Sequence, residues 1–231
     1  MIYNIFVCFV IGFISLVVFL FLLTAKKKNN KEPIKFISCF CLLFSLVWIS
    51  TGLGVLFVLL DRPDLDAFVF KWFSGPLIYL HLLPVFYYFG WSFFKDKNKI
   101  RFLFNGIFTF IVLITVVTFF IYKFTASEIT YWGSTLVPNK LTNDIFTYAI
   151  FVPTFIFIVA ELVRRFRNWK KTGDDNERQL LGFNLGLFIY ALTGFFDAIS
   201  SAQGWLMMLA RIGSILPSTV FYLSATWGSE E

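Results

Sequence analysis

Apolar runs of about twenty residues recur along almost the whole of this 231-residue chain, with short polar breaks between them. A helix needs about 20 apolar residues to cross the roughly 30 Å of hydrocarbon in a bilayer. Charged residues make up only 15% of the sequence, against about 25% in an ordinary soluble domain. The pattern predicts an all-α membrane protein, with residues 1–231 forming one integral membrane domain.

The apolar runs divide the chain into seven expected transmembrane helices. These spans are residues 2–24, 36–60, 67–94, 102–124, 145–163, 180–199 and 205–227. The first run has no basic segment before it and is longer than the 7 to 15 apolar residues of a signal peptide. We therefore interpret it as a permanent span, and the fold class as a seven-transmembrane-helix bundle.

Basic residues gather in alternate breaks between the spans. The segments "AKKKNNKEPIK", "KDKNKIR" and "RRFRNWKKTGDDNER" carry five, four and six Lys or Arg residues, out of twenty in the chain. Short loops rich in Lys and Arg stay on the cytoplasmic side of a membrane. We expect the N-terminus outside and the C-terminus in the cytoplasm. Orientation and contact with anionic lipid account for the net charge of +6, so no nucleic-acid partner is expected.

The single histidine lies in the third span, on one face with two other polar residues. Ser74, His81 and Tyr88 are seven residues apart, a spacing that drifts by only about 20° per heptad around a straight helix. That face should point into the bundle or into a wet cavity. Two interpretations remain open for His81: a neutral imidazole bonded to a neighbouring helix, or a group that contacts a ligand or responds to pH.

Prolines interrupt three of the expected spans. Pro76 and Pro84 flank the histidine, and Pro153 and Pro217 lie in the fifth and seventh spans. Each proline removes a backbone donor and can kink its helix. We expect breaks in these three helices.

Two charged residues lie deep enough in their spans to need a partner. Asp197 is near the end of the sixth span and Arg211 is inside the seventh, separated along an antiparallel hairpin by roughly 7 Å at 1.5 Å per residue. They predict an ion pair between the two spans, or an anion or polar-ligand site at Arg211. Glu161, in the fifth span, is expected to pair with Arg164 or Arg165.

Several kinds of membrane chemistry do not fit the residues present. One histidine is too few for a bis-histidine haem. A zinc or di-iron site needs three or four His, Cys or carboxylate ligands, and Cys39 and Cys41, two apart on a helix, point about 200° from each other. Residues 205–227 contain no lysine for a retinal Schiff base. Cys8, Cys39 and Cys41 lie in apolar runs and are expected to be buried small side chains. No cofactor, metal or catalytic residue is predicted, and we expect that the protein is not an enzyme.

The chain resembles the N-terminal seven-transmembrane sensor region of bacterial histidine kinases and related membrane signalling proteins. The likeness rests on "LLFSLVWISTGLGVLF", "LLPVFYYFGWSFF", "YWGSTLVPN" and "RRFRNWKKTGDDNERQLLGFNLGLFI". A shorter segment, "SGPLIYL", is also similar to the membrane half of some transcription regulators. The resemblance implies an output domain beyond Glu231 or a separate cytoplasmic signalling partner, and a homodimer stays open. It also implies a bacterial inner (plasma) membrane, and it assigns no ligand residues.

The expected function is a receptor-like sensor that passes an external or intramembrane stimulus inward. The candidate ligand-binding residues are Ser74, His81, Tyr88, Asp197 and Arg211. Two alternatives are a transporter or channel subunit and a membrane scaffold that recruits a partner. Flux across a membrane that depends on the buried polar residues would favour the transporter, and partner recruitment that ignores them would favour the scaffold.

Overall fold

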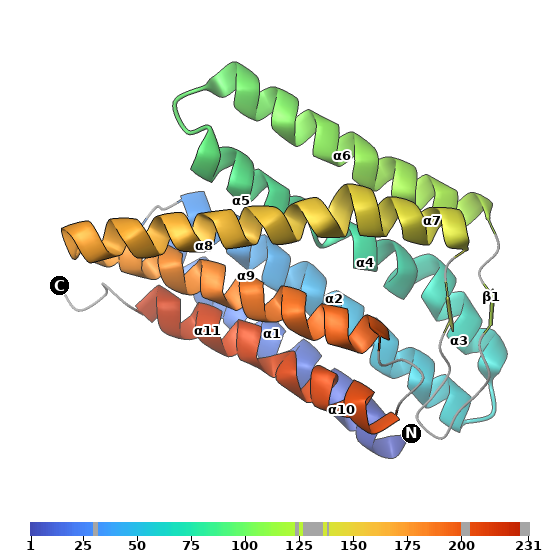
Figure 1. Ribbon diagram of the computed structural model, residues 1–231. Helices are drawn as coiled ribbons and strands as arrows, with labels where there is room; N and C mark the ends of the chain where they lie inside the picture. Colours follow the sequence, from blue (N-terminus) through green and yellow to red (C-terminus); the bar gives the residue numbers. More distant parts are fainter. Residues whose placement is uncertain (30–31, 123–124, 127–135, 138, 200–203, 227–231) are drawn as a thin grey trace.

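The computed structural model describes residues 1–29, 32–122, 125–126, 136–137, 139–199 and 204–226, and these form a bundle of long helices (Figure 1). Seven helical stretches among the described residues are long and apolar enough to cross a membrane. They are Ile2–Thr24, Glu32–Leu59, Pro63–Phe93, Asn98–Ile121, Lys140–Thr172, Asp175–Asp197 and Trp205–Thr226. The seven predicted spans are therefore confirmed, and the chain is a multi-pass membrane protein.

Three of the seven spans are built from consecutive helical segments. The first, second, fourth and sixth spans are single helices: α1 (Ile2–Asn29), α2 (Glu32–Leu59), α6 (Asn98–Ile121) and α9 (Asp175–Ile199). The third comprises α3 (Pro63–Val69), the π-helical turn η1 (Phe70–Ser74), α4 (Gly75–Leu80) and α5 (Leu83–Phe93). The fifth comprises α7 (Lys140–Ile145), η2 (Phe146–Phe151) and α8 (Val152–Thr172), and the seventh comprises α10 (Gly204–Gly213) and α11 (Ile215–Thr226).

Prolines explain where the composite spans change their helical form. Gly75 N–H donates to Phe70 O just before Pro76, and Val152 N–H donates to Thr147 O just before Pro153. Both bonds span five residues, one more than in an α-helix. A proline ring clashes with the carbonyl four residues earlier, so one widened turn gives the ring room.

In the third and seventh spans a short turn separates two helices, again shortly before a proline. Between α4 and α5, Leu82 N–H reaches Tyr79 O at 3.4 Å, and Pro84 occupies the first turn of α5. Between α10 and α11, Ser214 N–H is shared by the carbonyls of Ala210 and Arg211, at 3.0 and 2.9 Å. The predicted breaks are thus present in the third and seventh spans, whereas the fifth span is continuous from Lys140 to Thr172 and has a widened turn instead.

Each span packs against the next one in the sequence, and the seventh returns to the first. α1 lies against α2, the third span lies between α2 and α6, and α8, α9 and α11 continue the circuit back to α1. The α5–α6 and α8–α9 connections lie at one end of the bundle and the N-terminus at the other (Figure 1). We call these the basic end and the N-terminal end, because Lys95, Lys97 and residues 164–178 lie at the first.

A short antiparallel pair joins β1 (Thr125–Ala126) to β2 (Leu136–Val137), with Thr125 opposite Val137. Most of the segment "YWGSTLVPN", before the fifth span, lies outside the described residues, as do residues 200–203 between the sixth and seventh spans.

Aromatic side chains fill the centre of the bundle. Phe40, Phe86, Phe89, Phe183 and Phe221 are fully buried and come from four different spans. α6 contributes little to this core, and residues such as Phe102 and Phe110 face outward. An outward apolar face is what a helix needs where its neighbour is lipid rather than water.

Candidate functional site

His81 lies at the break in the third span and connects it to the sixth. Its Nδ1 is 3.0 Å from the carbonyl oxygen of Leu77, one turn earlier, and its Nε2 is hydrogen-bonded to the hydroxyl of Tyr190 on α9. A carbonyl oxygen only accepts hydrogen bonds, so Nδ1 carries the proton and donates. In the neutral imidazole, Nε2 then accepts from the Tyr190 O–H, and both ring nitrogens are satisfied.

Aromatic rings from the second span surround this pair. The ring centroids of Phe40 and Phe44 lie 5.7 and 6.1 Å from that of His81, and 5.0 and 5.4 Å from that of Tyr190. His81 is buried. Burial among rings excludes water, which makes the His81–Tyr190 hydrogen bond stronger and the loss of either partner more costly.

The predicted polar stripe points into the bundle along its whole length. Ser74 donates to Ser50 Oγ on α2 at 3.0 Å. Tyr88 accepts from Asn184 Nδ2 on α9 at 2.6 Å. Ser74, His81 and Tyr88 are all buried. Each bonds to a residue outside the stripe, and no two of them bond to the same residue. The stripe is therefore a series of separate contacts between helices, and its role in ligand binding stays a prediction.

Arg211 and Asp197 form the expected pair across the sixth and seventh spans. Arg211 Nε lies 3.0 Å from Asp197 Oδ1. The same guanidinium also donates through Nη1 to Asn4 Oδ1 on α1 and stands 5.8 Å from the centroid of the Trp48 ring on α2. One buried cation thus holds four spans together near the N-terminal end. A cation over a ring is attracted by about 0.5–1 kcal/mol where exposed and by more when water is excluded.

A second charged cluster lies near the basic end, and it includes the predicted partner of Glu161. Arg165 Nε is 2.7 Å from Glu161 Oε1, and Arg164 Nη2 is 2.6 Å from Glu161 Oε2. Ser92, at the end of the third span, donates to Glu161 and accepts from both arginines. Glu177, on α9, binds Arg165 Nη1 at 2.7 Å. The cluster joins the third, fifth and sixth spans.

The polar side chains that complete these clusters were not predicted. Tyr190, Asn184 and Asn4 bond to His81, Tyr88 and Arg211 respectively. Each lies in an apolar run where one amide or hydroxyl carries no periodic signal. A polar group left unpaired inside a membrane is costly. The sequence therefore indicates that His81, Tyr88 and Arg211 have partners, but it does not identify them.

A row of contacts connects the two groups of predicted site residues. The ring of Phe44 packs 6.1 Å from His81 on one side and 6.0 Å from Trp48 on the other, and Trp48 faces the guanidinium of Arg211. We call His81, Phe44, Trp48 and Arg211 the central row. It runs from the break in the third span towards the N-terminal end.

The cysteine prediction is correct for two residues and wrong for one. Cys8 and Cys41 are buried, whereas Cys39 is exposed because it lies on the outward face of α2. An apolar helix in a membrane has two apolar faces, one inward and one towards lipid, so composition alone does not distinguish them. Within the described ranges, no three His, Cys, Asp or Glu side chains converge where they could hold a metal ion.

Comparison with known proteins gives no relative: no family model, no curated protein and no solved structure matches this chain.

Proposed function

We propose that this protein is a receptor-like, signal-transducing membrane module of the bacterial plasma membrane, with its N-terminus outside and its basic end in the cytoplasm. The observation that carries the proposal is the central row, which joins a buried cation near the N-terminal end to the break in the third span. The orientation rests on the excess of Lys and Arg in the connections at the basic end.

In the proposed mechanism, the third span changes between two arrangements at its break near His81. A stimulus at the N-terminal end changes the contacts of Arg211 with Asp197 and Trp48. Trp48 and Phe44 then shift against His81, whose bond to Tyr190 fixes the third span to the sixth. A coupling of about 1–3 kcal/mol between the two ends is enough to change the populations about 5- to 150-fold. A cytoplasmic partner or output domain would read the change at the basic end.

A distance measurement in lipid nanodiscs tests this coupling. Spin labels at Asp96→Cys and Thr172→Cys, both exposed at the basic end, report on the spacing of α5 and α8. Cys39→Ser removes the exposed native thiol, while Cys8 and Cys41 are buried. We expect Arg211→Gln, at the opposite end, to shift the distance distribution, and His81→Phe to abolish that response.

The matched control is Arg62→Gln, because Arg62 is an exposed arginine whose ion pair among the described residues is with Asp64, two residues further along the chain. It should leave the distribution unchanged. If Arg211→Gln also left the distribution unchanged, the two ends would not be coupled and the proposed mechanism would be wrong.

The buried charges also suit a transporter or channel subunit, since ionisable residues within a membrane often lie on substrate pathways. Purified protein in proteoliposomes distinguishes the two functions. Ion or solute flux that is lost in Asp197→Asn or Arg211→Gln would favour the transporter, and its absence with intact coupling between the ends would favour the sensor.

A further inference from the structure

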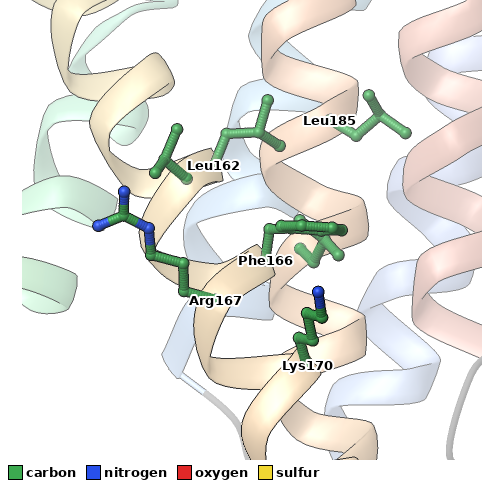
Figure 2. A pocket seen from close by; sticks show the side chains of 7 residues that line it. Leu162, Phe166, Arg167, Lys170 and Leu185 are labelled. Carbon is green, nitrogen blue, oxygen red and sulfur yellow. The ribbon is translucent and has the colours of Figure 1, made fainter.

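A groove between α8 and α9 opens on the outer surface of the bundle. Its volume is about 570 Å³, within the range of about 300–1,000 Å³ found for small-molecule sites. Figure 2 shows its lining side chains, with Leu162 and Phe166 on α8 and Leu185 across from them on α9. The full lining is Leu162, Val163, Phe166, Arg167, Lys170, Leu181 and Leu185.

The apolar part of the groove faces outward, towards what would be lipid. Val163 is 43% exposed, Phe166 50% and Leu185 41%. Leu162, Phe166 and Lys170 are four residues apart along α8, so they share one face over about 12 Å at 1.5 Å per residue. An outward apolar groove of this length in a membrane-spanning helix pair is a surface for a hydrocarbon chain.

Two cations line one end of the groove: Arg167 directly follows Phe166, and Lys170 lies about one turn beyond it. Arg167 and Lys170 are exposed, and within the described part of the chain neither has a carboxylate within ion-pair distance. Their neighbours Arg164 and Arg165 differ in this respect, since both pair with Glu161. The positive charge beside the groove is therefore uncompensated.

An indole marks the level of this end in the membrane. Trp169 lies between Arg167 and Lys170 in the sequence, with its ring centroid 6.3 Å from that of Phe166. Tryptophan is enriched where hydrocarbon meets headgroups. The cations therefore lie at headgroup level, and the apolar lining of the groove extends from there into the hydrocarbon.

We propose that this groove binds one anionic glycerophospholipid, with an acyl chain against Phe166, Leu181 and Leu185 and the phosphate between Arg167 and Lys170. The groove has an apolar lining and, at one end, two cations with no ion pair among the described residues. An anionic lipid has the complementary parts, an apolar chain joined to a negative headgroup. Arg167 adds a forked donor that suits phosphate oxygens, and Lys170 adds a point charge.

Lipid titration followed by native mass spectrometry tests the site. Protein in detergent is titrated with phosphatidylglycerol or with phosphatidylcholine of the same chains, and the first bound lipid is counted. At about 1 kcal/mol for each basic residue near a membrane surface, Arg167→Gln/Lys170→Gln should weaken phosphatidylglycerol binding about 30-fold and leave phosphatidylcholine binding nearly unchanged. Both residues are exposed, so the helices should still form, which circular dichroism checks.

Two controls separate the groove from general attraction. Lys95→Gln/Lys97→Gln removes the same charge from exposed positions at the same end and should change the affinity less than threefold. Leu185→Trp fills the groove while keeping both cations, and it should weaken binding at least tenfold. Leu113→Trp on α6, a position 49% exposed, should not.

Four results would overturn the proposal. Equal losses in the two charge variants would show diffuse attraction without a site. Equal binding of the two lipids would remove the role of the phosphate. Displacement of bound lipid by millimolar inorganic phosphate would mean that the apolar groove contributes nothing. A dimer that forms only without lipid and is abolished by Leu185→Trp would assign the groove to a second copy of the chain instead.

Discussion

Arg165 Nη1 on α8 lies 2.7 Å from Glu177 Oε1 on α9, across the connection that joins the two helices. Between them, α8 ends at Thr172, and the next residue, Gly173, has a φ of 66°, in the left-handed region that glycine adopts readily. The same guanidinium also binds Glu161 and Ser92. One side chain therefore closes the hairpin between the fifth and sixth spans and fastens the third span to it.

Removing the charge of Glu161 should be the most damaging single change among the ion pairs. Glu161→Gln leaves Arg165 buried with only Glu177 as a counterion, and breaking a buried pair from one side costs about 3–5 kcal/mol. Thermal unfolding in detergent measures the effect. Glu32→Gln breaks an exposed pair with Lys35 and should cost less than about 1 kcal/mol. Equal losses in the two variants would contradict the structural role of the buried cluster.

The Tyr190 hydroxyl is expected to contribute to stability through His81. Tyr190→Phe keeps the ring against Phe40 and Phe44 but leaves Nε2 of His81 buried without a donor, which costs about 1–3 kcal/mol. The free energy of unfolding in bicelles checks this value. Tyr148→Phe, at a position that is 72% exposed, should change it by less than about 0.5 kcal/mol. An unchanged stability in Tyr190→Phe would mean that water or another donor satisfies the imidazole.

Arg211 should be more sensitive to substitution than its partner Asp197. Arg211→Met loses the bonds to Asp197 and Asn4 and the contact with Trp48, whereas Asp197→Asn leaves the last two in place. A double-mutant cycle on the two substitutions should give a coupling energy of about 0.5–3 kcal/mol. A coupling energy near zero would show that the 3.0 Å pair contributes nothing to stability.

A close approach of the third span to α6 gives a fourth prediction. A methyl group on Gly75 would overlap the ring of Phe119, whereas one on Gly106 would meet no atom within 4 Å. We expect Gly75→Ala to destabilise the protein by about 1–3 kcal/mol through overpacking, and Gly106→Ala to be neutral or slightly stabilising because alanine favours the helix. Unfolding midpoints of the two variants, measured side by side, decide the matter, and equal midpoints would refute the tight contact.

The sequence was sufficient for the number of spans and for contacts between residues close along the chain. The length of each apolar run determines a span, and the spacing of Glu161, Arg164 and Arg165 on one helix determines their pairing. The Arg211–Asp197 pair was accessible because a short connection places the two helices side by side. In each case the partner is near in the sequence.

Contacts between distant spans could not be predicted in the same way. The partner of His81 is 109 residues away, and nothing in the third span indicates which helix its polar face meets. The contacts of Arg211 likewise include Asn4 on the first span and Trp48 on the second. These residues come close to Arg211 only when the seventh span packs against the first. Such contacts depend on how the bundle is arranged, and hydrophobic periodicity does not encode that arrangement.

The two halves of the third span make different kinds of contact with the neighbouring spans. The half that follows His81 ends in Ser92, whose bonds to Glu161 and Arg165 are charge-assisted, and such bonds are roughly twice as strong as neutral ones. In the half that precedes it, Ser74 donates a neutral hydrogen bond to Ser50 on α2. The turn at His81 therefore divides one span between two neighbours, with charge-assisted bonds joining α5 to the fifth span and a hydroxyl pair joining the segment before α4 to the second.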